Sequence, residues 1–363
     1  MRSFLSALGR KFFIKLAGLH WVVWFVLFAR AEIDILKIGA VCKDLPLNLP
    51  IQTLLMPGLL RQSRQKTSYR LTPKGYQLLD KIGFPYVPDK SYRTDPTTIR
   101  RRIHLAELML FLEELGINVF LQSPEATELS FLPSAVLRQK GASNVLGNTK
   151  LYGFLYSQSL TYIFYRLAEQ DSGLYTQNEE RIFHANGLLG QKKPAVIYTG
   201  QNSFEKLMQM LTETATHSTA DSYYTAMQKF SCPVCFVPLS EDGLRQLRMM
   251  TVPDYKEKLC KYLLGGRYQA SDNRWHDGID SKTGERYQIG IDFNLKEFDK
   301  GLPKHLIVLD FQQEAAQEVL SGKDIVLHSI STEAAEQVLE LPHNLPELTN
   351  EPYRTEKGEY VVV

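Results

Sequence analysis

Polar and apolar positions follow a short, regular pattern from Leu59 to Leu71. Leu59 and Leu60 end one apolar run, and Tyr69 and Leu71 are the apolar positions of a second run. The eight residues between them, 61–68, are all polar or charged. Two strand-like runs around a polar stretch are typical of a β-hairpin with a solvated tip. The pattern therefore predicts a hairpin.

A capped helix is predicted directly after this hairpin. Thr72 is a good N-cap, and Pro73 suits the first helical position, where its missing N–H removes no hydrogen bond. Gly83 is a suitable C-terminal stop. The apolar residues between these ends recur at helical spacing; they are Tyr76, Leu79 and Ile82.

The rest of the chain alternates between helical and strand-like segments, which predicts an α/β (α+β) fold. Prolines at 85, 88 and 96 indicate a linker. The predicted helices cover residues 98–115, 203–211, 313–320 and 332–341. The predicted strands cover 119–121, 160–165, 195–198, 235–239, 305–311 and 325–330, with a hairpin-like stretch around Gly284.

A length of 363 residues suits two or three domains. We predict a winged-helix-like domain at 1–88, because a hairpin followed by a capped helix suits the wing of that fold. A mixed α/β domain at 97–265, a C-terminal β/α extension at 266–341 and an acidic tail at 342–363 would follow.

Positive charge is concentrated around the predicted hairpin. From Leu59 to Ile103 the chain has eleven Lys and Arg against three Asp, a net of +8, whereas the whole chain is +2. From Asp310 to Val363, eleven acids face three bases, a net of −8. The hydrophobic content of 44% and charged content of 23% are ordinary globular values, so the asymmetry is local.

A hairpin rich in Arg and Lys can lie on DNA phosphates and release counterions, which gives salt-sensitive binding with little sequence preference. A solvated basic surface is the alternative interpretation. Residues 49–56 offer only Gln52 and Thr53 as polar side chains, so base-specific readout is not expected. The residues predicted to bind duplex DNA are Arg61, Arg64, Lys66, Arg70, Lys74, Arg100, Arg101 and Arg102.

The same region resembles a known family. Tyr69, Leu71, Thr72 and Gly75 form a Tyr-x-Leu-Thr-x-x-Gly core, and the arginine run 100–102 precedes an Ala-Glu pair at 106–107. This order is similar to the winged-helix replication-relaxation proteins of plasmids and integrative conjugative elements, in particular their mobile-element branch. Segments 134–144, 151–167, 176–183 and 235–247 follow in a similar order.

The resemblance implies an N-terminal winged helix that binds double-stranded DNA in replication or mobilisation of a mobile genetic element. The chain also departs from the family pattern at two places. Where family members have Arg-Pro-Asp-Ala, this chain has Leu132-Pro133-Ser134-Ala135, and the following strand, 160–165, has no carboxylate. If those acids bind a metal in the family, this chain has lost them.

The N-terminus has a mostly apolar run at 16–29, between Lys15 and Arg30. These fourteen residues fall short of the roughly 20 that a membrane helix needs. We favour a buried first helix, because residues 32–36 continue the helical pattern. Two alternatives remain: a membrane- or partner-docking helix at residues 11–30, and a signal peptide, since Ala29-Arg30-Ala31 resembles a cleavage site.

Four sparse cysteines suit a reducing cytoplasm. Cys232 and Cys235 have CxxC spacing, but no second ligand pair follows closely for a zinc site. A redox motif would place the first cysteine at a helix N-terminus, whereas the flanking residues here are strand-like. We therefore expect both cysteines in a core strand, with a metal site and a redox or disulfide pair as alternatives.

Catalytic chemistry is less well supported. The eight histidines never lie two residues apart, so the His-x-His metal pair of a relaxase is absent from the sequence. A metal-dependent nuclease would need clustered carboxylates. The candidates, which also suit surface acids or helix caps, are Glu179, Glu180, Asp292, Asp310 and Glu314; His276, Asp277 and Asp280 suit a turn better than a metal loop. No cofactor is predicted.

The sequence therefore favours a non-enzymatic DNA-binding accessory protein of a mobile element. Its basic wing would lie on the duplex backbone, and its α/β part would hold a relaxase, a replication protein or a second copy of the chain. The alternatives are a metal-dependent DNA nicking or relaxation enzyme, and a membrane-docked component of a conjugation apparatus.

Overall fold

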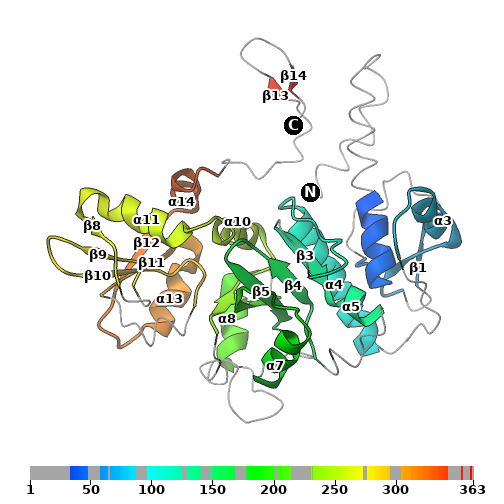
Figure 1. Cartoon of the computed structure of the whole chain (residues 1–363), viewed down its shortest axis with the longest axis horizontal. Coiled ribbons are helices and arrows are strands. Elements are labelled where there is room, and N and C mark those ends of the chain that lie inside the picture. The colour runs from blue at the N-terminus through cyan, green and yellow to red at the C-terminus, as the bar shows by residue number, and fades with distance from the viewer. Residues whose placement is uncertain are drawn as a thin grey trace. The chain divides into compact units, whose positions relative to one another are not determined.

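The protein is described here by a computed structural model. It describes residues 33–47, 58–63, 66–86, 96–124, 129–139, 146, 149–167, 177–200, 203–213, 230, 232–272, 276–294, 304–341, 353–354 and 360–361. The chain divides into two compact units. The first contains residues 1–156, 163–165 and 170–191, and the second contains 157–162, 166–169 and 192–363. Helices and sheets are mixed along the chain, which confirms the predicted α/β class (Figure 1).

The first unit begins with a helix at residues 33–42, followed by the predicted hairpin and capped helix. Strands β1 (Leu60–Gln62) and β2 (Tyr69–Leu71) pair antiparallel, and helix α3 (Pro73–Lys81) follows. An isolated bridge joins Leu45 to Tyr69 of β2. A small core holds these parts together; it consists of Leu36, Ala40, Leu71 and Leu79.

The hairpin and the capped helix are thus confirmed, but the predicted winged helix also includes residues before the hairpin. A winged helix needs a recognition helix in front of its wing. That segment, residues 48–57, lies outside the described part of the chain. The winged-helix assignment therefore remains a prediction, as does the role of residues 11–30, which also lie outside it.

A five-stranded sheet with the strand order β3-β4-β5-β6-β7 follows. Its strands are β3 (Ser130–Pro133), β4 (Gly153–Tyr156), β5 (Leu160–Arg166), β6 (Lys193–Thr199) and β7 (Val234–Phe236). Strands β3 and β4 pair antiparallel, and β6 and β7 pair parallel. Helix α4 (Pro96–Glu113) precedes β3, and the helices between the strands are α5 (Ser134–Gln139), α7 (Gln177–Ala185) and α8 (Phe204–Glu213). Every residue of β3 and β4 is buried, as in a strand covered on both faces.

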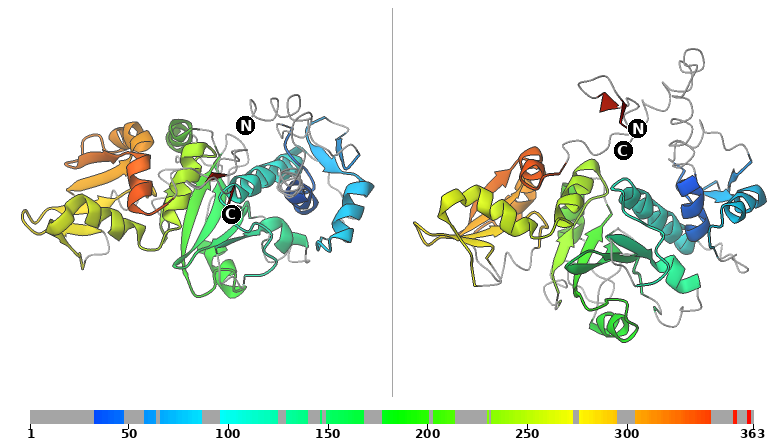
Figure 2. Two further views of the ribbon diagram at one scale, coloured as in Figure 1. Left: turned by 90° about the horizontal axis from the view of Figure 1, so that it is seen from above. Right: turned by 45° about the horizontal axis from the view of Figure 1, so that its top comes forward.

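The second unit contains a further five-stranded sheet with the order β12-β11-β10-β9-β8. Its strands are β8 (Tyr268–Gln269), β9 (Gly278–Asp280), β10 (Arg286–Ile289), β11 (His305–Leu309) and β12 (Val326–Ile330). The remaining elements are α10 (Glu241–Met250), α11 (Tyr255–Leu264), η3 (Gly265–Arg267), η4 (Asp310–Gln312), α13 (Gln313–Val319), α14 (Thr332–Val338) and the pair β13 (Tyr353–Arg354) and β14 (Tyr360–Val361). Helices α11 and α13 lie on opposite sides of this sheet (Figures 1 and 2).

One core cluster explains how the second sheet is covered. Alternate residues Ile307 and Leu309 of β11 pack with Leu259 of α11 and Ala335 of α14. The intervening residues of β11 face the other way, because successive side chains of a strand point to opposite faces. Helix α13 packs on β11 and β12. Both faces of β11 are therefore covered, and all five of its residues are buried.

Several predicted boundaries are corrected. The strand predicted at 119–121 is wrong, because no ladder forms there: an isolated bridge joins the preceding Asn118 to Ser130, and the amide N of Leu121 donates to the carbonyl of Phe131 at 3.3 Å. The strand predicted at 235–239 ends at Phe236, and Pro238 soon after it cannot donate to a ladder. The last predicted helix ends at Val338 instead of residue 341. The two compact units divide inside the region 97–265, and the predicted domain bounds stay a prediction.

Candidate nucleic-acid interface

The hairpin separates its residues by face. Leu60 lies opposite Leu71, and Arg61 lies opposite Arg70. Directly opposed residues of an antiparallel pair project to the same face. One face therefore supplies leucines to the core, and the other supplies two guanidinium groups. Arg61 is exposed, whereas Arg70 is half-buried.

Hydrogen bonds close the described part of the hairpin tip. The amide N of Ser63 donates to the carbonyl of Ser68 at 2.8 Å, and the amide N of Lys66 donates to the carbonyl of Ser63 at 2.9 Å. The hydroxyl of Ser63 accepts from the amide N of Thr67 at 3.2 Å. Lys66 has a φ of +54°, and its side chain is exposed. The turn therefore presents a lysine to solvent, while Arg64 beside it lies outside the described residues.

A buried carboxylate anchors the hairpin from beneath. Asp44 is 0% exposed, and its Oδ1 accepts from the Ser68 hydroxyl at 2.7 Å and from Arg70 Nε at 2.9 Å. Its Oδ2 lies 3.7 Å from Arg102 Nη1 of α4. A buried carboxylate needs such charged partners to offset its lost hydration. Arg70 and Arg102 therefore have a structural role in addition to any contact with a ligand.

The three arginines of α4 point to different surroundings. Arg102 contacts Asp44, whereas Arg101 Nη2 donates to the backbone carbonyl of Thr149. Arg100 is half-buried. Successive residues of a helix lie about 100° apart around its axis, so this divergence follows from the helical geometry. The side chains of the run 100–102 therefore do not all project from one face of α4.

Each residue of the Tyr-x-Leu-Thr-x-x-Gly motif has a local structural role. Tyr69 exchanges two backbone hydrogen bonds of 2.9 Å with Leu45, and Leu71 is in the core. The hydroxyl of Thr72 accepts from the amide N of Gly75 at 3.3 Å, which confirms the predicted N-cap. A Cβ on Gly75 would lie 2.6 Å from the carbonyl O of Leu59. The motif therefore specifies a strand, a cap and a close helix–strand contact.

The predicted DNA-binding residues thus fall into groups that differ in exposure. Arg61, Lys66 and Lys74 are exposed on the hairpin and on the first turn of α3. Arg70 and Arg101 are half-buried and donate to protein acceptors, Arg102 is half-buried and ion-paired with Asp44, and Arg100 is half-buried as well. Sequence reasoning did not find Asp44, because its partners lie far away along the chain and no local pattern marks it.

Known proteins offer no further guide: no family model, no curated protein and no solved structure matches this chain.

Three of the acidic residues considered for a metal site, Asp280, Asp292 and Asp310, have structural partners. Asp310 Oδ1 accepts from the Thr332 hydroxyl at 2.7 Å, and Asp292 Oδ2 lies 2.9 Å from Lys256 Nζ. Asp280 Oδ1 accepts from the amide N of Lys282 at 2.9 Å, which is the turn geometry that the sequence suggested. Among the described residues, no three His, Cys, Asp or Glu side chains gather as metal ligands.

The cysteines are all buried, and none of the four is in a disulfide. Cys235 is in β7, as predicted, and Cys232 lies just before it. Burial raises the pKa of the Cys260 thiol to about 12, and burial also raises the pKa of the Cys42 thiol strongly. Thiols with raised pKa values are poor nucleophiles at neutral pH.

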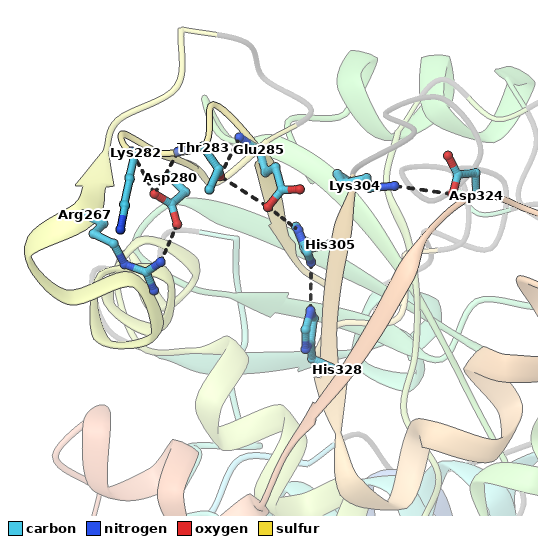
Figure 3. A network of polar contacts seen from close by, with 9 residues as sticks. All are labelled: Arg267, Asp280, Lys282, Thr283, Glu285, Lys304, His305, Asp324 and His328. Atoms are coloured by element: carbon cyan, nitrogen blue, oxygen red, sulfur yellow. Dashed lines mark hydrogen bonds and ion pairs between the residues drawn. The ribbon is translucent and has the colours of Figure 1, made fainter.

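A second polar network lies on the second sheet and reaches from the residue before β10 across β11 to the edge strand β12 (Figure 3). Glu285 Oε2 lies 3.0 Å from His305 Nε2, and His305 Nδ1 lies 2.9 Å from His328 Nε2. The rings of Tyr287 and His305 are stacked, with centroids 4.4 Å apart. This chain of carboxylate and two imidazoles fixes the orientation of the exposed His328 ring. Sequence reasoning missed it, because its members are far apart along the chain.

Within the described residues, no helix has both the length and the apolar character required to cross a bilayer.

Proposed function

We propose that the protein binds double-stranded DNA through the exposed cations of its hairpin, as a non-enzymatic accessory protein of plasmid or conjugative-element replication or mobilisation. The observation that carries the proposal is the exposure of Arg61 in strand β1 and of Lys66 in the turn, on a hairpin closed by backbone hydrogen bonds. A hairpin backbone ordered before binding loses little conformational entropy when a ligand binds. Lys74, at the start of α3, is a further exposed cation of the first unit.

The family resemblance supports the biological setting of this proposal. The Tyr-x-Leu-Thr-x-x-Gly core and the arginine run are similar to winged-helix replication-relaxation proteins, and such a role places the protein in the cytoplasm with DNA. A relaxase, a replication protein or a second copy would be the protein partner of the α/β part. Because the face of the hairpin supplies charges and few base-reading groups, the expected binding is to the phosphate backbone.

The test is a charge reversal of the hairpin. In the Arg61→Glu, Lys66→Glu variant, affinity for a labelled duplex at low salt should fall about tenfold or more. The slope of log K against log salt should become shallower by about 0.9 for each phosphate that the variant no longer neutralises. The matched control is Arg286→Glu with Lys258→Glu, since both residues are exposed in the second unit and the change in net charge is the same.

Two results would contradict the proposal. One is duplex binding that is equal in the hairpin variant and in the wild type. The other is an equal loss in the control variant, which would mean that net charge alone matters. A plasmid-nicking assay with magnesium or manganese separates the accessory role from the nicking-enzyme alternative, because an accessory protein leaves the plasmid supercoiled.

A further inference from the structure

Strand β12 is an outer strand of the second sheet. It pairs with β11, and no other strand of the described residues lies on its far side. Three of its five residues are exposed, namely Val326, His328 and Ser329, whereas every residue of β11 is buried. The described part of the chain therefore leaves this edge open to a further strand.

The backbone of β12 directs specific groups outward. The amide N of Val326 donates to the carbonyl of Lys304 at 2.8 Å, so the N–H and C=O of Val326 point toward β11. Because the direction alternates along a strand, the N–H and C=O groups of Leu327 and Ser329 point away from β11. A strand from another chain can pair with these groups.

This edge lacks the features by which natural sheets avoid edge-to-edge pairing. Edge strands are commonly very short, or they carry Lys, Pro or a bulge. Strand β12 reads Val-Leu-His-Ser-Ile, and its register with β11 is unbroken. The opposite edge of the same sheet, β8, has only two residues. The outer strands of the other five-stranded sheet, β3 and β7, are buried throughout.

We propose that β12 pairs with β12 of a second copy of this chain, antiparallel about a two-fold axis at His328. Leu327 then lies opposite Ser329 of the second copy on both sides of the axis, which satisfies the outward groups of both residues. Registers displaced by two residues would use groups that are already engaged. The N–H of Ile325 donates to the carbonyl of Lys323 at 3.0 Å, and the carbonyl of Ser331 accepts from Ala335.

The side chains of β12 fit this register. Val326, His328 and Ile330 project to one face of the strand. The pairing places Val326, which is 40% exposed, opposite Ile330 of the second copy, so an apolar cross-strand contact covers it. The ring of His328 is hydrogen-bonded to His305 of β11 at 2.9 Å, which turns it toward its own sheet and away from the edge (Figure 3).

The two ends of the strand differ in charge, which favours an antiparallel copy. The charged residues within three positions of the ends of β11 and β12 are Lys304, Lys323 and Asp324 at the start, and Asp310 and Glu333 at the end. Arg245, which pairs with Glu333, also pairs with Glu336, so the end of the strand stays acidic. Antiparallel pairing brings the basic start of each copy beside the acidic end of the other.

The assembly closes at two copies, because a two-fold axis uses the same edge of both chains and leaves only the short β8 edges outside. A single strand pair is a small interface, so we expect a dissociation constant on the order of micromolar. The pairing depends on the second unit alone and goes beyond the proposed DNA binding, which depends on the hairpin.

Disulfide cross-linking tests the register. In this register the Cα atoms of the two His328 residues are about 4.5 Å apart, within the range of a disulfide. His328→Cys should therefore form a covalent dimer under mild oxidation. In the matched variant Val326→Cys, the two new thiols lie on Cα atoms about 14 Å apart, so cross-linking should be at least tenfold lower. The native cysteines are buried and contribute little background. Equal cross-linking of both variants, or none in His328→Cys, would overturn the pairing.

Sedimentation of the full chain measures the association itself. The wild type should shift from monomer to dimer between about 1 and 100 μM. Val326→Lys should raise the dissociation constant about tenfold or more, because it places an ammonium group against Ile330 of the second copy. The control is Tyr262→Lys, which adds the same charge at an exposed position of α11 and should leave the constant unchanged. A wild type that stays monomeric, or equal weakening in both variants, would contradict the proposal.

The pairing and the DNA binding can fail separately. The Arg61→Glu, Lys66→Glu variant should dimerise like the wild type. A wild-type dimer that does not bind duplex DNA supports the pairing of β12 and overturns the proposed function. A wild-type monomer that binds duplex DNA through the hairpin supports the proposed function and overturns the pairing.

Discussion

Arg70 Nε donates a hydrogen bond of 2.9 Å to Oδ1 of Asp44, a carboxylate that solvent does not reach. The pair joins strand β2 to the segment that follows the helix at residues 33–42. Arg70 faces Arg61 across the hairpin, and direct opposition of like charges is unfavourable. Asp44 therefore stabilises a hairpin that carries two arginines on one face.

Replacing Asp44 tests this role. In Asp44→Asn the shape is kept, but Arg70 and Arg102 lose the charge that offsets their burial, so the free energy of unfolding should fall by about 3 kcal/mol. Urea denaturation of the full chain measures the loss. The control is Asp324→Asn, whose exposed pair with Lys304 should contribute less than about 0.5 kcal/mol. A loss as small as that of the control would remove Asp44 from its anchoring role.

Gly75 offers a test in which two physical effects have opposite signs. Helix propensity alone predicts that Gly75→Ala stabilises α3 by about 1 kcal/mol. The added Cβ would lie 2.6 Å from the backbone oxygen of Leu59, which cannot move aside easily. We therefore expect a destabilisation of about 2 kcal/mol. Thermal unfolding decides the sign, and Gly266→Ala is the control, because no atom lies within 4 Å of the position of its Cβ.

The Glu285–His305–His328 chain predicts a pH dependence of the second unit (Figure 3). Partial burial of its ring, followed by the charge of His305, lowers the pKa of His328 below its usual value of about 6.5. A group of this kind, which binds its proton less readily in the folded state, stabilises the fold above its unfolded pKa, and this stability is lost as the pH falls. The thermal unfolding midpoint should therefore decrease as the pH is lowered from about 7.5 to about 5.5.

The His328→Gln variant is the comparison for this pH dependence. It removes the titrating ring, so its midpoint should change less with pH over the same range. The hydrogen bond from His305 similarly lowers the pKa of Glu285, and a further loss below about pH 4.5 is expected in both proteins. Identical midpoint curves above about pH 5 would show that His328 does not contribute.

The thiols provide a further prediction. All four cysteines are buried, so Ellman's reagent should modify them slowly in the native protein and completely after unfolding. The control is the same protein in denaturant, where four thiols should react. Rapid native reaction of Cys232 or Cys235 would favour the CxxC pair as a redox site.

Local signals in the sequence identified some elements well and others poorly. Helix α3 was predictable, because its cap, its proline and its apolar spacing all lie close together in the sequence. Strands β3 and β4 were missed, because they are four-residue runs that are buried throughout and show no alternation. Helices α10 and α11 were also missed, although Ser240 is a good N-cap for α10.

The candidate site was predictable only in part. The charges of the hairpin could be read directly, since exposure follows from polarity at a turn. The internal contacts of Arg70, Arg101 and Arg102 could not be predicted from the sequence. Their partners, Asp44 and the Thr149 carbonyl, come close to them only in the tertiary fold.

The shared carboxylate of Asp44 has a mechanical consequence. Strand β2 and helix α4 are both attached to it, through Arg70 and Arg102. A displacement of the hairpin would therefore be coupled to α4 through this carboxylate, independently of the proline-containing connection between them. We expect the hairpin and α4 to move together when a polyanion binds.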